Sequence, residues 1–307
     1  TMLQLLSVTM DLPLTSELVE MQMAMMSSML TGKPMQQKDR ALVIGMLDKM
    51  LSSPNAASIM SKDTLNMVAS VVSTVAGSSF TSDGSREEAD QVMNLLSTMS
   101  AVSYQSMSPG ETPVVFATSN IDVVLQSNYG SMLQDFQIND NSNSRSILAN
   151  EAALISVPQL QVLAENDNQL FVEFMKFGNG INPFAWSSSS DNITSEVLSF
   201  KLMQKNSSAF EKFALDQLEN PIQIKLPKMS VKQGDTYLCQ SWDETDSTVE
   251  TWTTKGCIYA GETEGYIICN CNHTTSFASF IQYDANTQFN ALSKGIFIYS
   301  IIYYSIV

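Results

Sequence analysis

Residues 269 to 280 read C-N-C-N-H-T-T-S-F-A-S-F and carry half of the cysteines and the only histidine of a 307-residue chain. Histidine is the side chain whose ordinary pKa lies near neutrality, so it can exchange a proton at physiological pH. Its place beside two thiols and two hydroxyls suggests a role in proton transfer. On an extended backbone, the side chains of His273 and Thr275 fall on the same side. A neutral imidazole there accepts the hydroxyl proton of Thr275. Attack of that hydroxyl on the carbonyl of Thr274 would close a five-membered ring and shift the acyl group from nitrogen to oxygen.

Two other interpretations of the same residues stay open at this point. The four cysteines and His273 offer soft ligands for zinc, but Cys-x-Cys-x-His on one strand spaces its side chains about 7 Å apart, and no Cys-x-x-Cys knuckle is present. We therefore expect no metal site and no cofactor. The other interpretation is a structural histidine in a strand held by disulfides.

Composition limits the class of protein. The formal net charge is −15, and only one segment, residues 225–232 with three lysines, leans basic. So acidic a chain lacks a positive surface that could follow a phosphate backbone, which argues against nucleic acid as a partner. All four cysteines lie between Cys239 and Cys271, a cluster that indicates two local disulfides and an oxidising compartment. Sequence alone allows three pairings. Glycosylation triplets begin at Asn192, Asn206 and Asn272, and we expect strand burial to leave Asn272 bare.

Both ends of the chain suggest a fragment of a longer protein. The start lacks the basic region of a signal peptide. Residues 295–307 are 13 uncharged, strongly apolar positions, whereas a complete membrane helix needs about 20. The run is interpreted as the truncated start of a membrane span, with a buried C-terminal strand as the alternative.

The chain divides into two halves of different composition. Fifteen of the 19 methionines fall at or before Met107, but only two of the 26 aromatic residues do. The first half has the apolar spacing of helices, for which the methionines would be core, and Ser85 with Glu88 fits a capping box. We expect helices around residues 17–30, 43–51, 65–75 and 86–99. The predicted domains are a helical subdomain (1–109), a β subdomain (110–287) and a stalk with the start of a membrane helix (288–307).

The second half has short apolar runs separated by Asn, Asp, Gly and Ser clusters, the pattern of an antiparallel sandwich. The fold class is therefore α+β: a helical bundle followed by an antiparallel, twisted β-sandwich. Strands are expected at residues 114–117, 121–125, 170–174, 197–203, 222–226, 237–242, 256–260 and 266–271.

The residues around the opening stretch follow a known order. The chain resembles the GPS proteolysis-site motif of the GAIN domain, found in adhesion G-protein-coupled receptors and polycystin-like proteins, whose pattern is C-x-x-W, W, G-C and C-x-C-N-H-L-[ST]-x-F-A. Every cysteine, both tryptophans, the glycine and the Asn-His and Phe-Ala pairs are present. Thr274 stands where the family has Leu. The matching residues span 239–280 and include Cys239, Trp242, Trp252, Gly256, Cys257, Cys269, Cys271, His273, Thr275, Phe277 and Ala278.

The resemblance implies a role for each of these residues. Cys239 would pair with Cys269 and Cys257 with Cys271, and Trp242, Trp252 and Gly256 would be structural, the tryptophans packing against the disulfides. Cleavage would fall between Thr274 and Thr275, with His273 as base and Thr275 as nucleophile. The segment after the cut, with Phe277, Ala278, Phe280 and Ile281, would be a tethered agonist.

Three functions follow from these observations. The first is a self-cleaving extracellular domain of a membrane receptor at the face of the plasma membrane. Its partners would be its own C-terminal fragment, the membrane-spanning region and an unknown extracellular ligand. The second is a non-cleaving adhesion or mechanosensing module of a polycystin-like membrane protein. The third is a secreted hydrolase, which would need an acidic residue to orient His273 and an open pocket, and neither is evident from the spacing.

Overall fold

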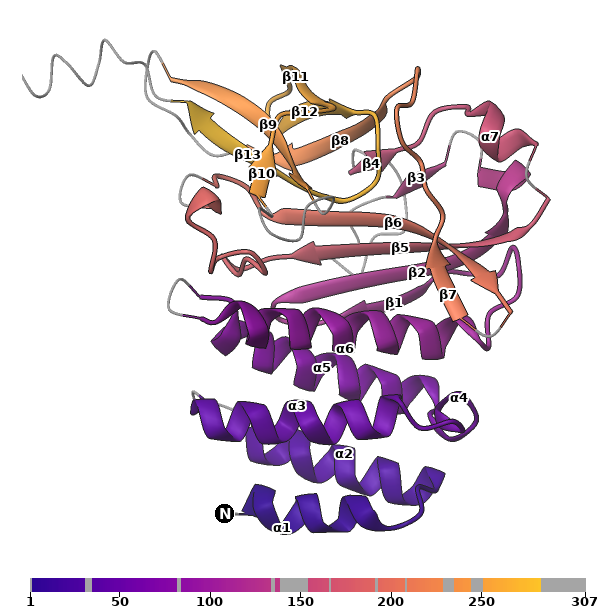
Figure 1. Cartoon of the computed structure of the whole chain (residues 1–307), viewed down its shortest axis with the longest axis vertical. Helices are drawn as coiled ribbons and strands as arrows, with labels where there is room; N and C mark the ends of the chain where they lie inside the picture. Colours follow the sequence, from indigo (N-terminus) through magenta and orange to yellow (C-terminus); the bar gives the residue numbers. More distant parts are fainter. Residues whose placement is uncertain are drawn as a thin grey trace, which may run out of the picture.

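The structure is a computed structural model that describes residues 2–30, 35–81, 84–133, 136–138, 154–165, 167–190, 193–207, 209–228, 235–243 and 251–282. Helices come first and antiparallel sheets follow, so the chain has the α+β class expected (Figure 1). None of the helices in these ranges is long and apolar enough to cross a membrane. The predicted stalk and membrane segment, 288–307, lie outside the described residues.

The helices form a stack on one side of the sheets, with α5 and α6 nearest to them (Figure 1). Each of the longer helices buries one apolar stripe against its neighbours, which is why the apolar spacing predicted them. The methionines at 23, 26, 46, 50 and 99 are buried in this core, as their spacing indicated. The helices are α1 (Met2–Val8), α2 (Ser16–Leu30), α3 (Gln37–Leu51), α4 (Ala56–Ile59), α5 (Lys62–Ser79) and α6 (Arg86–Tyr104), with a 3₁₀ turn η1 (Thr9–Asp11).

The start of α6 shows half of the expected capping box. Ser85 Oγ accepts a hydrogen bond from the main-chain N–H of Glu88 at 3.2 Å. The Glu88 carboxylate, however, binds Arg40 of α3 and the Ser79 hydroxyl. Although burial raises the pKa of Glu88, the hydrogen bonds from Arg40 and Ser79 outweigh it and hold the pKa below its usual value. The glutamate therefore joins α6 to α3 and to the end of α5.

Two antiparallel sheets follow the helices. Sheet A has the strand order β1-β2-β5-β6-β13-β9-β10, with β7 beside β6, and sheet B has the order β11-β12-β8-β4-β3. Their strands are β1 (Val114–Ala117), β2 (Ile121–Tyr129), β3 (Gln137–Ile138), β4 (Ile155–Ser156), β5 (Gln169–Phe177), β6 (Val197–Asn206), β7 (Ala209–Lys212), β8 (Ile222–Pro227), β9 (Thr236–Asp243), β10 (Thr251–Thr253), β11 (Cys257–Glu262), β12 (Tyr266–Cys271) and β13 (Ser276–Gln282). Short helical segments η2 (Gly130–Leu133), α7 (Gln161–Ala164) and η3 (Ser188–Ser190) lie between them.

Sheet A is the middle layer of the molecule (Figure 1). One of its faces packs on the helices, where Phe80 of α5 contacts Phe177 of β5. The other face packs on sheet B, and this second core joins residues of β5 and β6 to residues of β8 and β12. Apolar side chains therefore occupy both faces of β5, which is buried over nearly its whole length.

The last described strand is not at an edge. β13 lies between β6 and β9 and runs antiparallel to both. Six consecutive residues of β13, from Phe277 to Gln282, pair with β9. The C-terminal end of the described chain is therefore an inner strand of sheet A.

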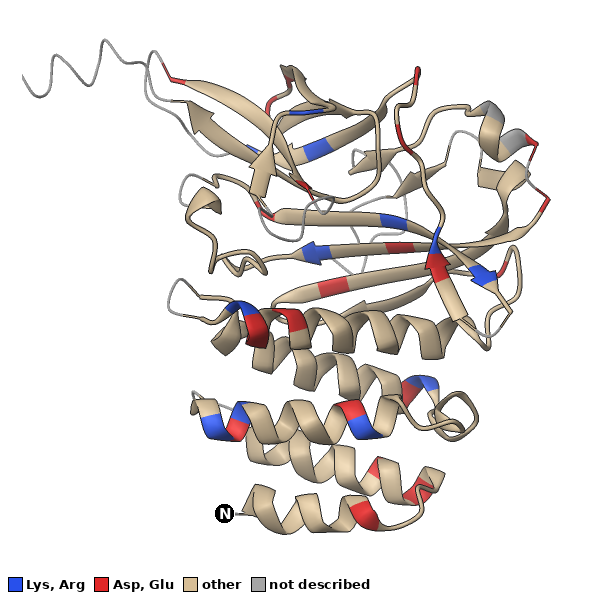
Figure 2. Cartoon of the chain, in the orientation of Figure 1, with Lys and Arg blue, Asp and Glu red and all other residues tan. Residues whose placement is uncertain are grey.

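Charged side chains are sparse over this framework. Lys and Arg are scattered over helices and strands and gather along no single element in the view of Figure 2. Three charged residues of the described chain are buried, Glu88, Glu173 and Lys176, and of these Glu173 of β5 is the least exposed, at 4%, and lies opposite Lys201 of β6. Burial raises the pKa of Glu173, and the positive charge of Lys201 offsets only part of that effect.

Candidate functional site

The turn from Asn272 to Thr275 carries the chain from sheet B to sheet A. β12 ends at Cys271 in sheet B, and β13 begins at Ser276 in sheet A. An extended backbone from His273 to Thr275 was expected from the sequence, and in the structure residues 272–275 lie outside both strands. The chain must leave one layer of the sandwich here and enter the other, and this change of layer interrupts the ladder.

Two disulfides fix the strand that leads into this turn. Cys239–Cys269 joins β9 of sheet A to β12 of sheet B, with Cα atoms 5.8 Å apart. Cys257–Cys271 joins β11 to β12, where the two residues lie directly opposite each other. This is the pairing that the resemblance implies. Since both bonds end on β12, the position of the turn relative to both sheets is set covalently.

Gly256 leaves room for the His273 ring. Its φ of +74° is in the left-handed region that favours glycine, and a Cβ at this position would clash with Asn272 Oδ1 and lie 2.9 Å from His273 Nδ1. Asn272 also donates its main-chain N–H to Gly256 O at 2.8 Å. The imidazole is half-buried, with Nδ1 3.0 Å from Asn272 Oδ1. The bare backbone of Gly256 and the Asn272 amide thus form one wall of the imidazole site.

The two threonines after the histidine are both buried, at 1% and 2% exposure. Thr275 donates its hydroxyl hydrogen to the main-chain carbonyl of Trp242 at 2.9 Å, and its own carbonyl accepts from the Phe200 N–H at 3.0 Å. Thr274 Oγ1 has no hydrogen-bond partner among the described residues. The Thr274–Thr275 peptide bond is thus held between β6 and β9.

A cavity of about 360 Å³ borders this peptide bond. Its inner wall is formed by buried residues, among them Ser241, Thr274 and Thr275, and His273 also lines it. Its rim is exposed and charged, with Lys212, Asp216 and Lys255. The arrangement joins an imidazole, a hydroxyl, a peptide carbonyl and access from solvent in one place, which are the requirements of nucleophilic attack followed by hydrolysis.

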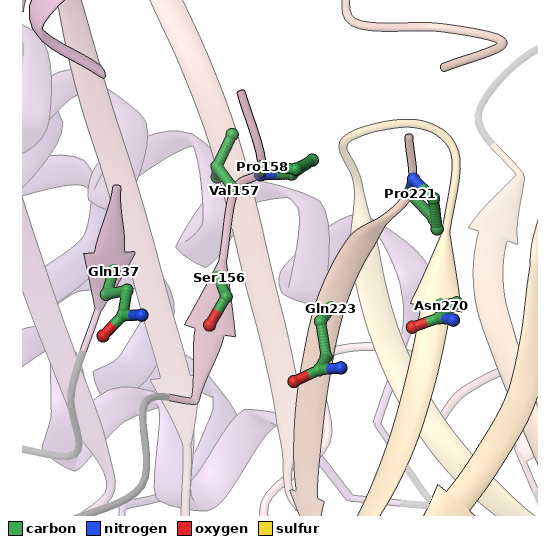
Figure 3. A pocket seen from close by; sticks show the side chains of 7 residues that line it. All are labelled: Gln137, Ser156, Val157, Pro158, Pro221, Gln223 and Asn270. Atoms are coloured by element: carbon green, nitrogen blue, oxygen red, sulfur yellow. The ribbon is translucent and has the colours of Figure 1, made fainter. Parts of the chain in front are cut away.

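A second hollow, of about 440 Å³, lies on the outer face of sheet B (Figure 3). Asn270, Gln223, Ser156 and Gln137 form a row across four strands, in which each pairs with the next. Val157, Pro158 and Pro221 complete the lining. None of these side chains titrates near neutral pH. The hollow therefore offers neither a base nor an activated nucleophile, and the cavity at the turn is the candidate site.

Comparison with known proteins decides the family. The model of the GPS family, described as GAIN subdomain B, matches residues 15–283, most of the chain. The chain belongs to the GPS/GAIN family. It is 25% identical over 207 residues to the mouse adhesion G-protein coupled receptor G7, a match that covers 64% of this chain and 25% of the receptor. It thus spans about a quarter of the length of this relative. It also matches the full extracellular region of zebrafish Gpr126/Adgrg6, with a TM-score of 0.42 and 14% identity, over 80% of this chain and 35% of that one.

The tryptophans of this GAIN domain are core residues on the side of sheet A that faces the helices. Trp242 stacks on Phe184 with ring centroids 4.2 Å apart, and Trp252 contacts Trp242 and Phe280. The expectation that they pack against the disulfides was wrong, because the cysteines belong to the core between the two sheets. Side chains alternate along β9, so Cys239 and Trp242, three residues apart, point to opposite faces of sheet A.

The segment that follows the Thr274–Thr275 bond is buried in the GAIN domain. Phe277 and Ala278 are 0% exposed and Phe280 is 3% exposed, whereas Ile281 is half-buried. Phe277 faces sheet B, and its ring centroid is 6.2 Å from that of His273. Phe280 faces the aromatic cluster around Trp252.

The charged part of the cavity was not predicted from the sequence. Asp216 and Asp243 line it, although no acidic residue was evident from the spacing. Asp243 directly follows the C-x-x-W segment, a signal that was available in the sequence. Lys212 and Asp216 come from β7 and the segment after it, and nothing in the sequence connects them to His273, which lies 61 and 57 positions later.

Proposed function

We propose that the chain is the extracellular, self-cleaving domain of a membrane receptor and cuts itself once between Thr274 and Thr275. The observation that carries the proposal is that the only histidine of the chain and this peptide bond border the same solvent-connected cavity. Membership of the GPS/GAIN family and the similarity to an adhesion receptor support it.

The proposed reaction has two steps. Thr275 Oγ1 attacks the carbonyl carbon of Thr274 while its proton passes to His273, and collapse of the tetrahedral intermediate breaks the C–N bond as His273 returns the proton to the leaving amine. The product is an ester that joins Thr274 to the Thr275 side chain. Water then hydrolyses the ester, which leaves a carboxylate on Thr274 and a free amine and hydroxyl on Thr275. The protein needs no cofactor for either step.

The two fragments should stay together after the cut. β13 keeps its pairing with β6 and β9, and burial of each large side chain such as Phe277 or Phe280 contributes about 1.5–3 kcal/mol. The proposed role of this segment is that of a tethered agonist for the membrane-spanning region. Removal of the N-terminal fragment by force, after an extracellular ligand is bound, would expose it.

A second candidate is a non-cleaving adhesion or mechanosensing module. The hydrogen bond from Thr275 to the Trp242 carbonyl favours it, because this bond holds the hydroxyl hydrogen that the base must remove. The presence of Thr274 where the family has Leu points the same way. The two candidates share the fold and differ only in whether the bond is cut.

The deciding experiment is a reducing, denaturing gel of the purified chain with N-terminal sequencing of any smaller band. Self-cleavage gives two bands, the smaller of which begins at Thr275, and the two co-elute in native gel filtration. A single band of full length would establish the non-cleaving module. Two fragments that separate on native gel filtration would contradict the proposed masking of the agonist segment.

A further inference from the structure

Two buried hydroxyls without a partner border the cavity. Only three buried side-chain polar atoms of the described residues have no hydrogen-bond partner: Gln22 Oε1, Ser241 Oγ and Thr274 Oγ1. Two of the three belong to residues that line the cavity with His273 and Thr275. A buried polar atom left unsatisfied costs about 1–3 kcal/mol, so buried polar groups are almost always paired with protein or with ordered water. Two such atoms at one cavity indicate that a polar ligand occupies it.

The two hydroxyls reach the cavity from different elements. Ser241 lies in β9 between Phe277 of β13 and Thr253 of β10, and it is 0% exposed. By strand alternation its side chain shares the face of Cys239, which is the face toward sheet B. Thr274 lies in the turn and contributes the carbonyl of the bond to be cut. The two hydroxyls therefore come to the cavity from different segments of the chain.

The cavity suits a water molecule. A buried water occupies about 30 Å³ and needs two to four polar partners. The cavity is large enough for several waters, and its exposed rim connects it to solvent. A leucine at position 274, as in the family pattern, would place methyl groups where this chain has a hydroxyl. Water is therefore a better fit for this chain than an apolar group.

We propose that Ser241 and Thr274 hold the water that hydrolyses the ester formed on Thr275. This inference rests on the proposed self-cleavage. The oxygen of the held water attacks the ester carbonyl of Thr274, and His273 accepts the proton of the water. The ester C–O bond then breaks, and His273 gives that proton to the Thr275 oxygen. Ser241 is a positioning residue, because it acts through the water and not on the ester.

The test separates hydrolysis from the acyl shift. Hydroxylamine attacks the ester directly and does not need the held water. In cell-free synthesis of the full chain, we expect Ser241→Ala to slow spontaneous cleavage about tenfold, the cost of one lost hydrogen bond to the attacking water. Cleavage driven by hydroxylamine should stay within twofold of the parent rate. Thr274→Val, which removes the hydroxyl but keeps the shape, should behave in the same way.

A buried serine far from the cavity provides the matched control. Ser103 of α6 is 4% exposed and donates to the Met99 carbonyl, so Ser103→Ala also removes a buried hydroxyl but should leave both rates unchanged. The proposal that Ser241 holds the water is wrong if Ser241→Ala cleaves as fast as the parent. It is also wrong if the substitution slows hydroxylamine-driven cleavage as much as it slows spontaneous cleavage. If the parent chain gives no fragments with or without hydroxylamine, the proposed self-cleavage is wrong.

A crystal structure of the Thr275→Ala chain tests the water site without cleavage. We expect an ordered water within hydrogen-bond distance of both Ser241 Oγ and Thr274 Oγ1. The Ser241→Ala/Thr275→Ala chain should lack it. A dry cavity, or a water that contacts neither hydroxyl, would overturn the inference whatever the gels show.

Discussion

Thr275 donates its hydroxyl hydrogen to the main-chain carbonyl of Trp242, 33 positions earlier in the chain, at 2.9 Å. The bond anchors the turn to β9 and directs the proton toward the backbone. Transfer of this proton to His273 therefore requires the hydroxyl to give up the Trp242 carbonyl first. The position of the nucleophile is set by sheet A, whereas the base follows a strand of sheet B.

The first prediction concerns the two residues that the reaction needs. Thr275→Ala and His273→Ala should abolish cleavage, since they remove the nucleophile and the base, whereas Thr275→Ser should keep it because a hydroxyl remains. A time course on denaturing gels measures this. If Thr275→Ala still gives the same junction, a contaminating protease makes the cut.

The second prediction concerns Gly256. Gly256→Ala introduces a Cβ that clashes with Asn272 Oδ1 and the His273 ring, so we expect the imidazole to move and cleavage to slow more than tenfold. The left-handed backbone adds about 1–2 kcal/mol of strain. Gly180→Ala is the matched control, because φ is +77° there and no atom lies within 4 Å of the added Cβ. In urea it should lose only the part of the stability that the backbone strain costs, and it should keep its cleavage rate; equal cleavage rates in the two variants would contradict the contact with His273.

The third prediction concerns the disulfides. The Cys239–Cys269 bond spans 30 residues and the Cys257–Cys271 bond spans 14. Replacement of either pair by serine should lower the free energy of unfolding by about 3 kcal/mol, with the larger loss for the longer loop. Urea denaturation measures both losses. Because both bonds end on β12, each double variant should also slow cleavage, and normal cleavage without them would show that the turn holds its shape unaided.

The fourth prediction concerns the pH dependence of stability. Burial raises the pKa of Glu173 in the folded chain, so the folded state binds more protons than the unfolded state between the unfolded pKa, about 4.3, and the raised value. The contribution of Glu173 to stability must then fall as pH rises through this window. Glu173→Gln removes the free-energy cost of ionising a buried carboxyl group. It should therefore stabilise the chain at pH 7 by about 1–2 kcal/mol, with little effect at pH 3.5.

Urea denaturation at the two pH values measures the difference, and Glu219→Gln, at an exposed position, is the control. Lys201 is half-buried and keeps contact with solvent, so it should tolerate loss of its partner. A variant that is less stable at pH 7 would mean that the Glu173–Lys201 attraction exceeds the cost of burial.

Local patterns predicted most of the elements but not their arrangement. The four long helices follow from apolar spacing such as Val92, Leu95, Leu96 and Met99, because each buries one stripe. The short strands β3, β4, β7 and β10 were not predicted, since a few residues carry too little periodicity. The motif order predicted His273 and Thr275 as site residues, a prediction that awaits the cleavage assays, but the turn that carries them is a consequence of which sheet each flanking strand joins. The approach of Gly256 to His273, 17 positions apart, likewise depends on the pairing of β11 with β12.

The inner position of β13 has a consequence for biosynthesis. β13 comes after both β6 and β9 in the chain and fills the gap between them, so sheet A stays in two parts until Gln282 has left the ribosome. Contacts between residues so distant in sequence form slowly, and the chain must remain unpaired at two strand edges until then. A chain truncated before β13 would expose these edges and be retained or degraded. The site around the Thr274–Thr275 bond therefore forms only after β13 has been synthesised and paired. Self-cleavage cannot occur before translation has passed the bond that is cut.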